Sequence, residues 1–541
     1  MPTDWVRHGA TTVTRIDTAA PADGSSADLD VSPSAQDFAS AYASGRPLVL
    51  STRLIADLET PVSAYLKLAR VGPPSFLLES VEGGAVRGRY SIIGLKPDLV
   101  WRALGGHAEI DRHPGTPQSS YVKAAEPTLQ SLRAVLDESR IDLPEDLPPM
   151  AAGVFGYMGY DTIRLVENLP NQPPDALGVP DAILVRPTIM VIFDSVRDEM
   201  TVVTPVRPAA GVTAEAARAA AIGRLSSVVA ALDAPSTHAA APAEGTLALA
   251  EPQSNTSPAE FMAMVEKARE YIKAGDIFQV VLSQRFSTPF PLPPFALYRA
   301  LRRLNPSPFL FHLDFGDFAL VGSSPEILVR VRAGEVTIRP IAGTVRRGAT
   351  AAEDRLLSEQ LLADPKELAE HLMLLDLGRN DVGRVASVGT VRVTEKFVVE
   401  RYSHVMHIVS NVVGRLAQGA DTVDALMAGF PAGTVSGAPK VRAMEIIDEL
   451  EKSKRGPYAG CVGYFAADGE MDTCIVLRTA LVKDGMLHVQ AGAGVVYDSQ
   501  PENEQQECIN KAKAVVRAAE ETVRFAGGAG GGRTGNRGAW G

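Results

Sequence analysis

Asp364-Pro365-Lys366-Glu367-Leu368-Ala369-Glu370-His371 begins a segment, ending at Asp381, that has the pattern of a well-capped helix. Asp364 suits the N-cap and Pro365 the first helical position, and Glu367 falls at N3, which predicts a capping box. Glu367 and Glu370 share one face, where two carboxylates repel each other unless a cation or a proton lies between them. The apolar side of the helix is expected at Leu361, Leu368, Leu372 and Leu375.

A second pair of glutamates occurs near the end of the chain. Residues 499–519 predict another helix, in which Glu504 and Glu507 share a face and Lys511 lies one turn beyond Glu507. Either pair alone is typical of a solvent-exposed helix face, because glutamate is seldom buried. Facing each other across a cleft, the two pairs would supply the hard oxygen ligands that Mg2+ prefers. The sequence leaves open either two solvated faces or one shared Mg2+ site.

The composition argues against several classes of protein. The 541 residues include 53 Lys and Arg against 64 Asp and Glu, a net charge of −11, so nucleic acid is not an expected partner. The three cysteines, Cys461, Cys474 and Cys508, form no CxxC pair, which favours reduced thiols and a cytoplasmic location. The N-terminus lacks the apolar segment of a signal peptide, and no apolar run reaches about 18 residues, so no membrane span is expected.

Apolar patterns predict several antiparallel hairpins beside long helices. Residues 188–193 and 200–203 have the pattern of two strands around a turn, and so do residues 309–314 and 318–321. This mixture favours the α+β class with large antiparallel β-sheets. Composition predicts a disordered tail, an N-terminal domain, an Ala- and Pro-rich linker, a second domain and a Gly-rich tail, at 1–35, 36–233, 234–255, 256–520 and 521–541.

Three further groups of residues could take part in chemistry. His404 and His407 form an H-x-x-H pattern without the further ligands of a zinc site, so they are either strand histidines with local partners or proton-transfer groups. The loop Gly433–Lys440 does not match the GxxxxGK[ST] phosphate loop, but its backbone N–H groups could bind a carboxylate, and Gly492–Gly494 allows a similar close approach. Arg478 could bind a carboxylate through two hydrogen bonds or form an ordinary ion pair.

Motifs spread over roughly residues 45 to 520 together resemble those of the chorismate-utilising enzymes, and within that family the component I subunits of anthranilate synthases. They are Leu77-Leu78-Glu79-Ser80, Pro340-Ile341-Ala342-Gly343-Thr344, Glu367–His371, Leu374–Asp381, Ser403-His404-Val405-Met406-His407, Gly433–Lys440 and Glu504–Lys511. The resemblance implies an α+β fold of two closely associated subdomains, with β-sheets inside and helices outside. It implies Mg2+ as cofactor and the conversion of chorismate and ammonia to anthranilate and pyruvate, the first step of tryptophan biosynthesis.

The resemblance also assigns roles to single residues. It implies that Glu370 and Glu507 bind Mg2+ directly, while Glu367 and Glu504 act through water. The implied substrate contacts are Gly343, Thr344, Tyr458, Arg478, Gly492, Ala493, Gly494 and Lys511. The implied catalytic residues are Glu326, His407 and Thr434. Glu326 would be the general acid for the departing hydroxyl group, which requires a raised pKa, and His407 would act in the elimination of pyruvate.

Two positions distinguish between members of the family. The aminodeoxychorismate synthases, which are the alternative activity, carry a nucleophilic lysine where this chain has Ala342, and alanine offers no nucleophile. The isochorismate and salicylate synthases carry a lysine base where this chain has Gln279, and glutamine cannot take up a proton. Both positions favour anthranilate synthase. A non-catalytic tryptophan sensor is an alternative of another class.

The resemblance further implies an inhibitor and a partner. Leu77–Ser80 and Asn305–Leu310 resemble the two halves of the family's tryptophan feedback site, which makes residues 36–233 a regulatory domain; an ordinary core strand and turn are the alternative. The implied inhibitor contacts are Leu78, Ser80, Asn305, Pro308, Phe309 and Leu310. No cysteine lies in the Gly-rich elbow of a glutamine amidotransferase, and the segment after residue 520 is short. Ammonia is therefore expected from a separate glutaminase subunit, component II, in a hetero-oligomer, with a heterotetramer as the expected assembly.

Overall fold

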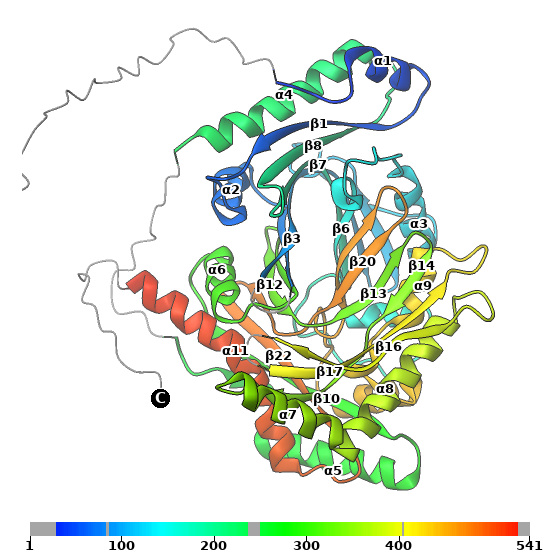
Figure 1. Ribbon diagram of the computed structural model, residues 1–541, viewed down its shortest axis with the longest axis vertical. Coiled ribbons are helices and arrows are strands. Elements are labelled where there is room, and N and C mark those ends of the chain that lie inside the picture. The colour runs from blue at the N-terminus through cyan, green and yellow to red at the C-terminus, as the bar shows by residue number, and fades with distance from the viewer. Residues whose placement is uncertain (1–28, 83–85, 236–248, 403–404, 528–541) are drawn as a thin grey trace, which may run out of the picture.

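The computed structural model describes residues 29–82, 86–235, 249–402 and 405–527 (Figure 1). Most of both predicted tails, much of the predicted linker and His404 lie outside these residues. The helices are α1 (Ala35–Ala43), α2 (Pro61–Leu68), α3 (Thr128–Glu138), α4 (Ala214–Asp233), α5 (Pro258–Ala274), α6 (Pro294–Leu304), α7 (Ala351–Ala363), α8 (Pro365–Gly383), α9 (Thr422–Gly429), α10 (Lys440–Leu450) and α11 (Pro501–Gly527). Short 3-10 turns occur at η1 (Ala69–Val71), η2 (Pro149–Ala151), η3 (Tyr160–Leu165) and η4 (Gly433–Val435).

The strands fall on both sides of the predicted linker. The first group is β1 (Leu48–Ile55), β2 (Ser75–Glu82), β3 (Val86–Leu104), β4 (His107–Asp111), β5 (Val122–Lys123), β6 (Gly153–Met158), β7 (Ala182–Asp194) and β8 (Glu199–Val206). The second group begins with β9 (Gln253–Ser254), β10 (Gln279–Pro289), β11 (Phe309–Asp314), β12 (Phe318–Ser324), β13 (Ile327–Arg332), β14 (Glu335–Ile338) and β15 (Ile341–Arg346). It continues with β16 (Arg392–Arg401), β17 (Val405–Arg415), β18 (Gly437–Ala438), β19 (Cys461–Ala466), β20 (Met471–Ile475), β21 (Thr479–Lys483) and β22 (Met486–Val495).

The strands of the described residues form one branched antiparallel network centred on β3 and β7, which pair along most of their length. One branch runs from β3 through β2, β11, β12, β21 and β22 to β10. The other runs from β7 through β6, β19, β20, β13 and β14 to β17, which also pairs with β15 and β16. The structure therefore confirms the predicted α+β class with large antiparallel sheets.

Helices cover the outer faces of both branches (Figure 1). The helix α8 packs on β15 and β17, α11 packs on β22 and α6, and α4 packs on β8 and β1. These contacts place the two glutamate-bearing helices, α8 and α11, over the far ends of the two branches. In the described part of the chain, no helix combines the length and the apolar character needed to cross a bilayer.

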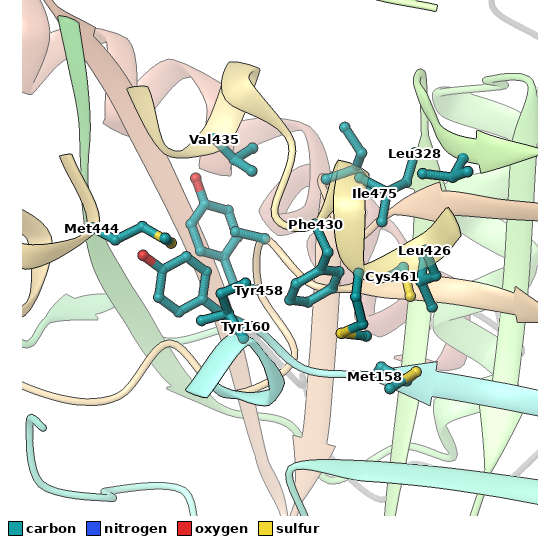
Figure 2. Close-up of a cluster of buried hydrophobic side chains, with 14 of the residues drawn as sticks. Met158, Tyr160, Leu328, Leu426, Phe430, Val435, Met444, Tyr458, Cys461 and Ile475 are labelled. Carbon is teal, nitrogen blue, oxygen red and sulfur yellow. The ribbon is translucent and has the colours of Figure 1, made fainter. Parts of the chain in front are cut away.

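Each large hydrophobic core takes residues from both sides of the predicted linker. One core, shown in part in Figure 2, contains Trp101 and Phe261, and a second contains Phe38 and Tyr298. The pairs β2–β11 and β6–β19 also join the two halves through backbone hydrogen bonds. The halves therefore share their cores, and the position of the boundary at 234–255 stays a prediction.

The local capping signals have mixed outcomes. Ser257 and Glu260 form a reciprocal capping box at the start of α5, with Pro258 at the first helical position. The predicted tail at 1–35 is too long, because Ser32 pairs with Ser51 of β1 and α1 begins at Ala35. The three cysteines are free and buried, as expected for reduced structural thiols.

Candidate functional site

The helix α8 begins as predicted, but it lacks the predicted capping box. The Asp364 carboxylate accepts hydrogen bonds from the backbone N–H groups of Lys366 at 2.9 Å and Glu367 at 3.5 Å. The Asp364 N–H donates to the Leu361 carbonyl rather than to Glu367. The Glu367 carboxylate instead lies beside Gly343, with Oε2 3.0 Å from the position that a Cβ atom on Gly343 would occupy. Glu367 is therefore free to act toward β15.

The prediction of which α8 residues form its apolar side is also partly wrong. Leu372 is 50% exposed, whereas Leu375 is buried as predicted. The buried face instead includes His371 and Leu374, because α8 packs on β15 and β17 along that line. His371 is buried with its Nε2 atom 2.7 Å from the Ser410 hydroxyl. A strand that arrives from elsewhere in the sequence thus selects which face of the helix is buried.

The fold brings the two predicted glutamate pairs close enough for the charge of one pair to affect the pKa values of the other. Burial raises the pKa of Glu370, and the negative charge of Glu507 raises it further. Burial likewise raises the pKa of Glu367, with a smaller contribution from the charge of Glu370. Glu504 has a pKa raised by burial and by the neighbouring charge of Glu507. Glu367, Glu370 and Glu504 are therefore partly buried beside the exposed Glu507, and the four carboxylates form one acidic cluster rather than two separate solvated faces.

This cluster fits a cation that takes few protein ligands. Within the described residues, no group of three or more His, Cys, Asp or Glu side chains is arranged to hold a metal ion by itself. Mg2+ commonly keeps several waters and takes one or two carboxylates together with oxygen atoms of the substrate. Lys511 partly neutralises the cluster, because its Nζ atom lies 2.6 Å from Glu507 Oε1 and donates to the Gly492 carbonyl at 2.9 Å. The donor set is suited to Mg2+ shared with an anionic substrate.

Glu326 has the properties required of a general acid. It lies between β12 and β13, and only 6% of it is exposed. Burial raises its pKa from 4.5 to about 8, so the carboxyl group is mostly protonated at pH 7. The Thr434 hydroxyl, in η4, donates to the two carboxyl oxygens at 3.1 Å each, which lowers the pKa slightly against the effect of burial. The structure thus brings together two of the predicted catalytic residues.

His407 is a neutral imidazole with an identifiable tautomer. It lies on β17, opposite Thr344 of β15, and burial lowers its pKa to about 4. Its Nδ1 atom lies 3.0 Å from the Gly343 carbonyl and 3.1 Å from the Thr344 hydroxyl. A carbonyl oxygen only accepts hydrogen bonds, so Nδ1 carries the proton and Nε2 keeps a free lone pair. His407 can therefore accept a proton at Nε2.

The predicted substrate glycines lie where backbone approaches site side chains closely. A Cβ atom on Gly492 would lie 2.8 Å from the Tyr458 hydroxyl oxygen, and one on Gly494 would lie 2.8 Å from Gln279 Nε2. Gly343 adopts φ +63, a conformation that favours glycine. Ala493 is fully buried between the two β22 glycines. Side chains at the glycine positions would fill the space beside Tyr458, Gln279 and Glu367.

Arg478 provides a partly buried positive charge that has no hydrogen-bond or ion-pair partner among the described residues. It lies in the connection between β20 and β21, next to the β-sheet surface that carries His407. Burial lowers the pKa of its guanidinium group. Among the described residues, no hydrogen bond or ion pair satisfies this guanidinium group. The ordinary ion pair, one of the two sequence alternatives, is absent there, and the free fork suits a carboxylate ligand.

Most of the predicted inhibitor contacts line one cavity. Its volume is about 850 Å3, and it lies between β2, the start of β11 and the β19–β20 hairpin. The predicted contacts that line it are Leu78, Ser80, Pro308, Phe309 and Leu310. Asn305 does not line it, and instead ends α6 with its backbone carbonyl bonded to the Ser323 hydroxyl. The cavity is therefore distinct from Glu326, Thr434 and the acidic cluster.

Three contacts of the site were not predicted from the sequence, although Gln279 was already a position that distinguishes members of the family. Gln279 donates a hydrogen bond to Glu370, and its own Oε1 atom is buried without a partner. The ring of Tyr402 packs edge-on against His407, with 5.4 Å between the ring centroids. Arg455 bonds to the backbone of η4 beside Thr434. Tyr402 and Arg455 lie only a few residues from predicted site residues, which is the one signal the sequence offered.

Comparison with known proteins shows which family the chain belongs to. A family model for chorismate binding enzymes matches residues 96–517. The chain is 58% identical over 501 residues to anthranilate synthase component 1 of Cereibacter sphaeroides, which covers 92% of this chain and 99% of the relative. The protein of the same name from Thermus thermophilus is 48% identical over 468 residues, covering 86% of this chain and 96% of the relative.

Solved structures give the same result. Anthranilate synthase component I from Streptococcus pneumoniae is 40% identical with a TM-score of 0.69, covering 86% of this chain and 99% of that one. MenF, the menaquinone-specific isochorismate synthase from Escherichia coli, is 22% identical with a TM-score of 0.65 and covers 89% of this chain and 95% of that one, a likeness of fold alone. The chain therefore belongs to the chorismate binding enzymes, and within them to the anthranilate synthase component 1 proteins.

Proposed function

We propose that this chain carries out the Mg2+-dependent conversion of chorismate and ammonia to anthranilate and pyruvate, as the first step of tryptophan biosynthesis. The observation that carries the proposal is the Glu326–Thr434 pair, in which a buried carboxyl group has a pKa of about 8. Such a group is protonated at neutral pH and can give its proton to a departing hydroxyl. The curated relatives named anthranilate synthase component 1 support the same activity.

The proposed reaction balances as chorismate plus ammonia giving anthranilate, pyruvate and water. The nitrogen of ammonia bonds to ring carbon C2 while the C4–oxygen bond breaks, and the hydroxyl leaves as water with a proton from Glu326. A proton is then lost from C2 and the C3–oxygen bond breaks, which makes the ring aromatic. The enolpyruvyl group takes up a proton on its methylene carbon and leaves as pyruvate.

His407 and Arg478 supply the other functions of this sequence. The free Nε2 lone pair of His407 can take the C2 proton, because its Nδ1–H group is held by the Gly343 carbonyl. The unpaired guanidinium of Arg478 can hold a substrate carboxylate through two hydrogen bonds, so that ligand binding relieves an uncompensated buried charge. His407 lies beside the Thr344 hydroxyl, and Arg478 is near enough for its charge to lower the pKa of His407.

The acidic cluster supports the proposal of Mg2+. Glu370 and Glu507 would bind the ion, and Glu367 and Glu504 would hold its waters, because the mutual repulsion of these carboxylates is relieved by a cation. When bound, Mg2+ would neutralise the ring carboxylate and make the ring more electron-poor. Gln279 fixes the Glu370 carboxylate through its side-chain amide.

Product analysis tests the proposal directly. Purified protein incubated with chorismate, ammonium chloride and MgCl2 should form fluorescent anthranilate together with an equal amount of pyruvate. Accumulation of the 4-amino compound without pyruvate would favour aminodeoxychorismate synthase, although Ala342 offers no nucleophile for that route. Binding of tryptophan without any turnover of chorismate would favour the non-catalytic sensor.

We further propose a glutaminase partner and feedback inhibition by tryptophan. The component 1 names of the relatives support a partner that supplies ammonia from glutamine. The cavity of about 850 Å3 supports an inhibitor site, because apolar residues such as Leu78 and Phe309 line it. Titration of the initial rate with tryptophan tests the inhibitor, and copurification with a glutaminase tests the partner.

A further inference from the structure

Arg455 is a fully buried cation that is absent from the proposed catalytic and binding residues. It follows α10, and 1% of it is exposed. Its Nη1 atom donates to the Val435 carbonyl at 2.7 Å, and Nη2 donates to the Val281 carbonyl at 2.7 Å. One guanidinium group therefore connects η4 with β10.

Glu451 neutralises this charge without reaching the proposed site itself. Arg455 donates to Glu451 Oε2 from Nε at 3.0 Å and to Oε1 from Nη2 at 2.6 Å. Glu451 Oε1 also accepts from the N–H group of Ser283 at 2.8 Å and from its hydroxyl at 2.9 Å. The ion pair is thereby tied to a second position of β10. A buried pair with its hydrogen bonds filled in this way has a fixed geometry.

The guanidinium group also packs on two aromatic rings. It lies 4.7 Å from the ring centroid of Tyr160 and 5.6 Å from that of Tyr458. Figure 2 shows these two rings beside each other, with Val435 close to the hydroxyl end of Tyr458. Tyr160 belongs to η3 in the first half of the chain, whereas Tyr458 is a predicted substrate contact. Arg455 thus packs on one ring from the first half of the chain and on one predicted substrate contact.

These contacts lie next to Thr434, whose side chain forms a hydrogen bond with Glu326. Val435 follows Thr434, whose hydroxyl donates to Glu326, and the Ser436 carbonyl of the same turn accepts from the Val281 N–H at 2.8 Å. The Val281–Ser436 bond and the Arg455 fork hold η4 against β10. We infer that Arg455 is a positioning residue, which keeps the Thr434 hydroxyl on Glu326 and the Tyr458 ring beside Gly492. The inference rests on the proposed roles of Thr434, Glu326 and Tyr458.

Lysine cannot replace Arg455 in this position. The arginine fork donates in fixed directions to two carbonyls and a carboxylate and presents a flat face to the tyrosine rings. A lysine ammonium group keeps the charge opposite Glu451 but cannot reach all of these acceptors at once. Arg455→Lys therefore tests position rather than charge. We expect it to leave η4 free to shift, which weakens the Thr434–Glu326 hydrogen bond.

The direct test follows the protonation of Glu326 in the protein without substrate. The carboxyl band of Glu326 is identified by infrared difference spectroscopy against Glu326→Gln and titrated in each variant. Because the Thr434 hydroxyl stabilises the charged form, its displacement should move the Glu326 titration upward, on the order of one pH unit in Arg455→Lys. Thr434→Val should give a similar shift, and the double variant should give no further shift.

Arg164→Lys is the matched control. Arg164 also forms a largely buried double ion pair, with Asp161 at 3.0 Å and Asp448 at 2.7 Å, but among the described residues its hydrogen-bond and ion-pair partners include none of the proposed site. It should lower the melting temperature and leave the Glu326 titration unchanged. An Arg455→Lys titration equal to that of wild type, or an equal shift in both variants, would overturn the inference. If Arg455→Lys does not fold, Glu451→Gln takes its place, and an unchanged Glu326 titration in that variant would overturn the inference.

Kinetics add a readout that a purely structural role would not move. In folded Arg455→Lys, we expect kcat to fall through Thr434 and KM for chorismate to rise through Tyr458, each by about tenfold. The basic limb of the kcat profile should move in the direction of the Glu326 titration. Absence of anthranilate from wild-type protein would refute the proposed function. The titration of Glu326 would still decide whether Arg455 positions η4.

Discussion

Glu326→Gln should make the protein more stable at alkaline pH while abolishing turnover. The pKa of Glu326 is about 8 in the folded protein against an ordinary value of 4.5, a difference of 8 − 4.5 = 3.5 units. At about 1.4 kcal/mol per unit, this pKa difference lowers the free energy of unfolding by roughly 5 kcal/mol well above pH 8 and by about 3 kcal/mol at pH 7, relative to its value below pH 4.5. The neutral amide of glutamine has nearly the same shape and avoids this cost.

The sign of the effect depends on pH. A raised folded pKa means that protonated Glu326 contributes its full stability below pH 4.5 and loses it as the pH rises through about 8. Urea unfolding at about pH 5, 7 and 9 measures the difference between wild type and Glu326→Gln. The difference should be small at the lowest pH and grow by several kcal/mol toward the highest. Glu359→Gln, at an exposed position of α7, is the matched control and should show no such trend.

The same variant provides a test that can fail. A stability difference that stays constant between about pH 5 and 9 would show that Glu326 is ionised at neutral pH. It would then be unable to donate a proton to the departing hydroxyl, and the general-acid role would have to be withdrawn. Turnover of chorismate by Glu326→Gln at a rate near that of wild type would refute the role independently.

Three other substitutions test separate parts of the site. Glu370→Gln removes one charge from the acidic cluster, so the metal-free protein should melt at a higher temperature. Its melting temperature should not rise further when MgCl2 is added. A rise equal to that of wild type would contradict the role of Glu370. Arg478→Met should raise KM for chorismate about 100-fold, because it removes the guanidinium group proposed to bind a carboxylate. It should not lower the stability, because it also removes a positive charge that burial disfavours. An unchanged KM would contradict carboxylate binding. Leu78→Trp should fill part of the cavity of about 850 Å3 and weaken inhibition by tryptophan at least about tenfold with kcat nearly unchanged; equal inhibition would place the inhibitor elsewhere.

The start of α8 shows how far local sequence reasoning reaches. Asp364 and Pro365 fix the first turn through bonds within a few residues, and both were predicted. Glu367 satisfied the same local rule, yet its carboxylate lies beside Gly343 of β15. Leu372 satisfied the apolar spacing, yet it is exposed because β15 and β17 pack on a different face. Each failure has one cause, which is a strand distant in sequence that competes with the local signal.

The site shows the same division. Resemblance could name Glu326 and Thr434, but only the fold shows that burial raises the pKa of the first and that the second donates to it. Arg455 had no motif of its own, because its acceptors are main-chain carbonyls at positions 281 and 435, whose residue types carry no information about the contact. Hydrogen bonds to backbone atoms leave little trace in the sequence of the acceptor. Groups of this kind are found only after the chain is folded.

Burial keeps both the proposed acid, Glu326, and the proposed base, His407, in their uncharged forms. It lowers the pKa of His407 to about 4 and raises that of Glu326 to about 8, so both are neutral between these values. Ionised forms of both groups would compete with Arg478 and the acidic cluster for the charges of the substrate. In the proposed mechanism, neutral groups would leave substrate binding to Arg478 and Mg2+, and would exchange protons only where bonds break. The low exposure of Glu326 and His407 is therefore part of the chemistry, and loosening either residue toward water should narrow the pH range in which the enzyme works.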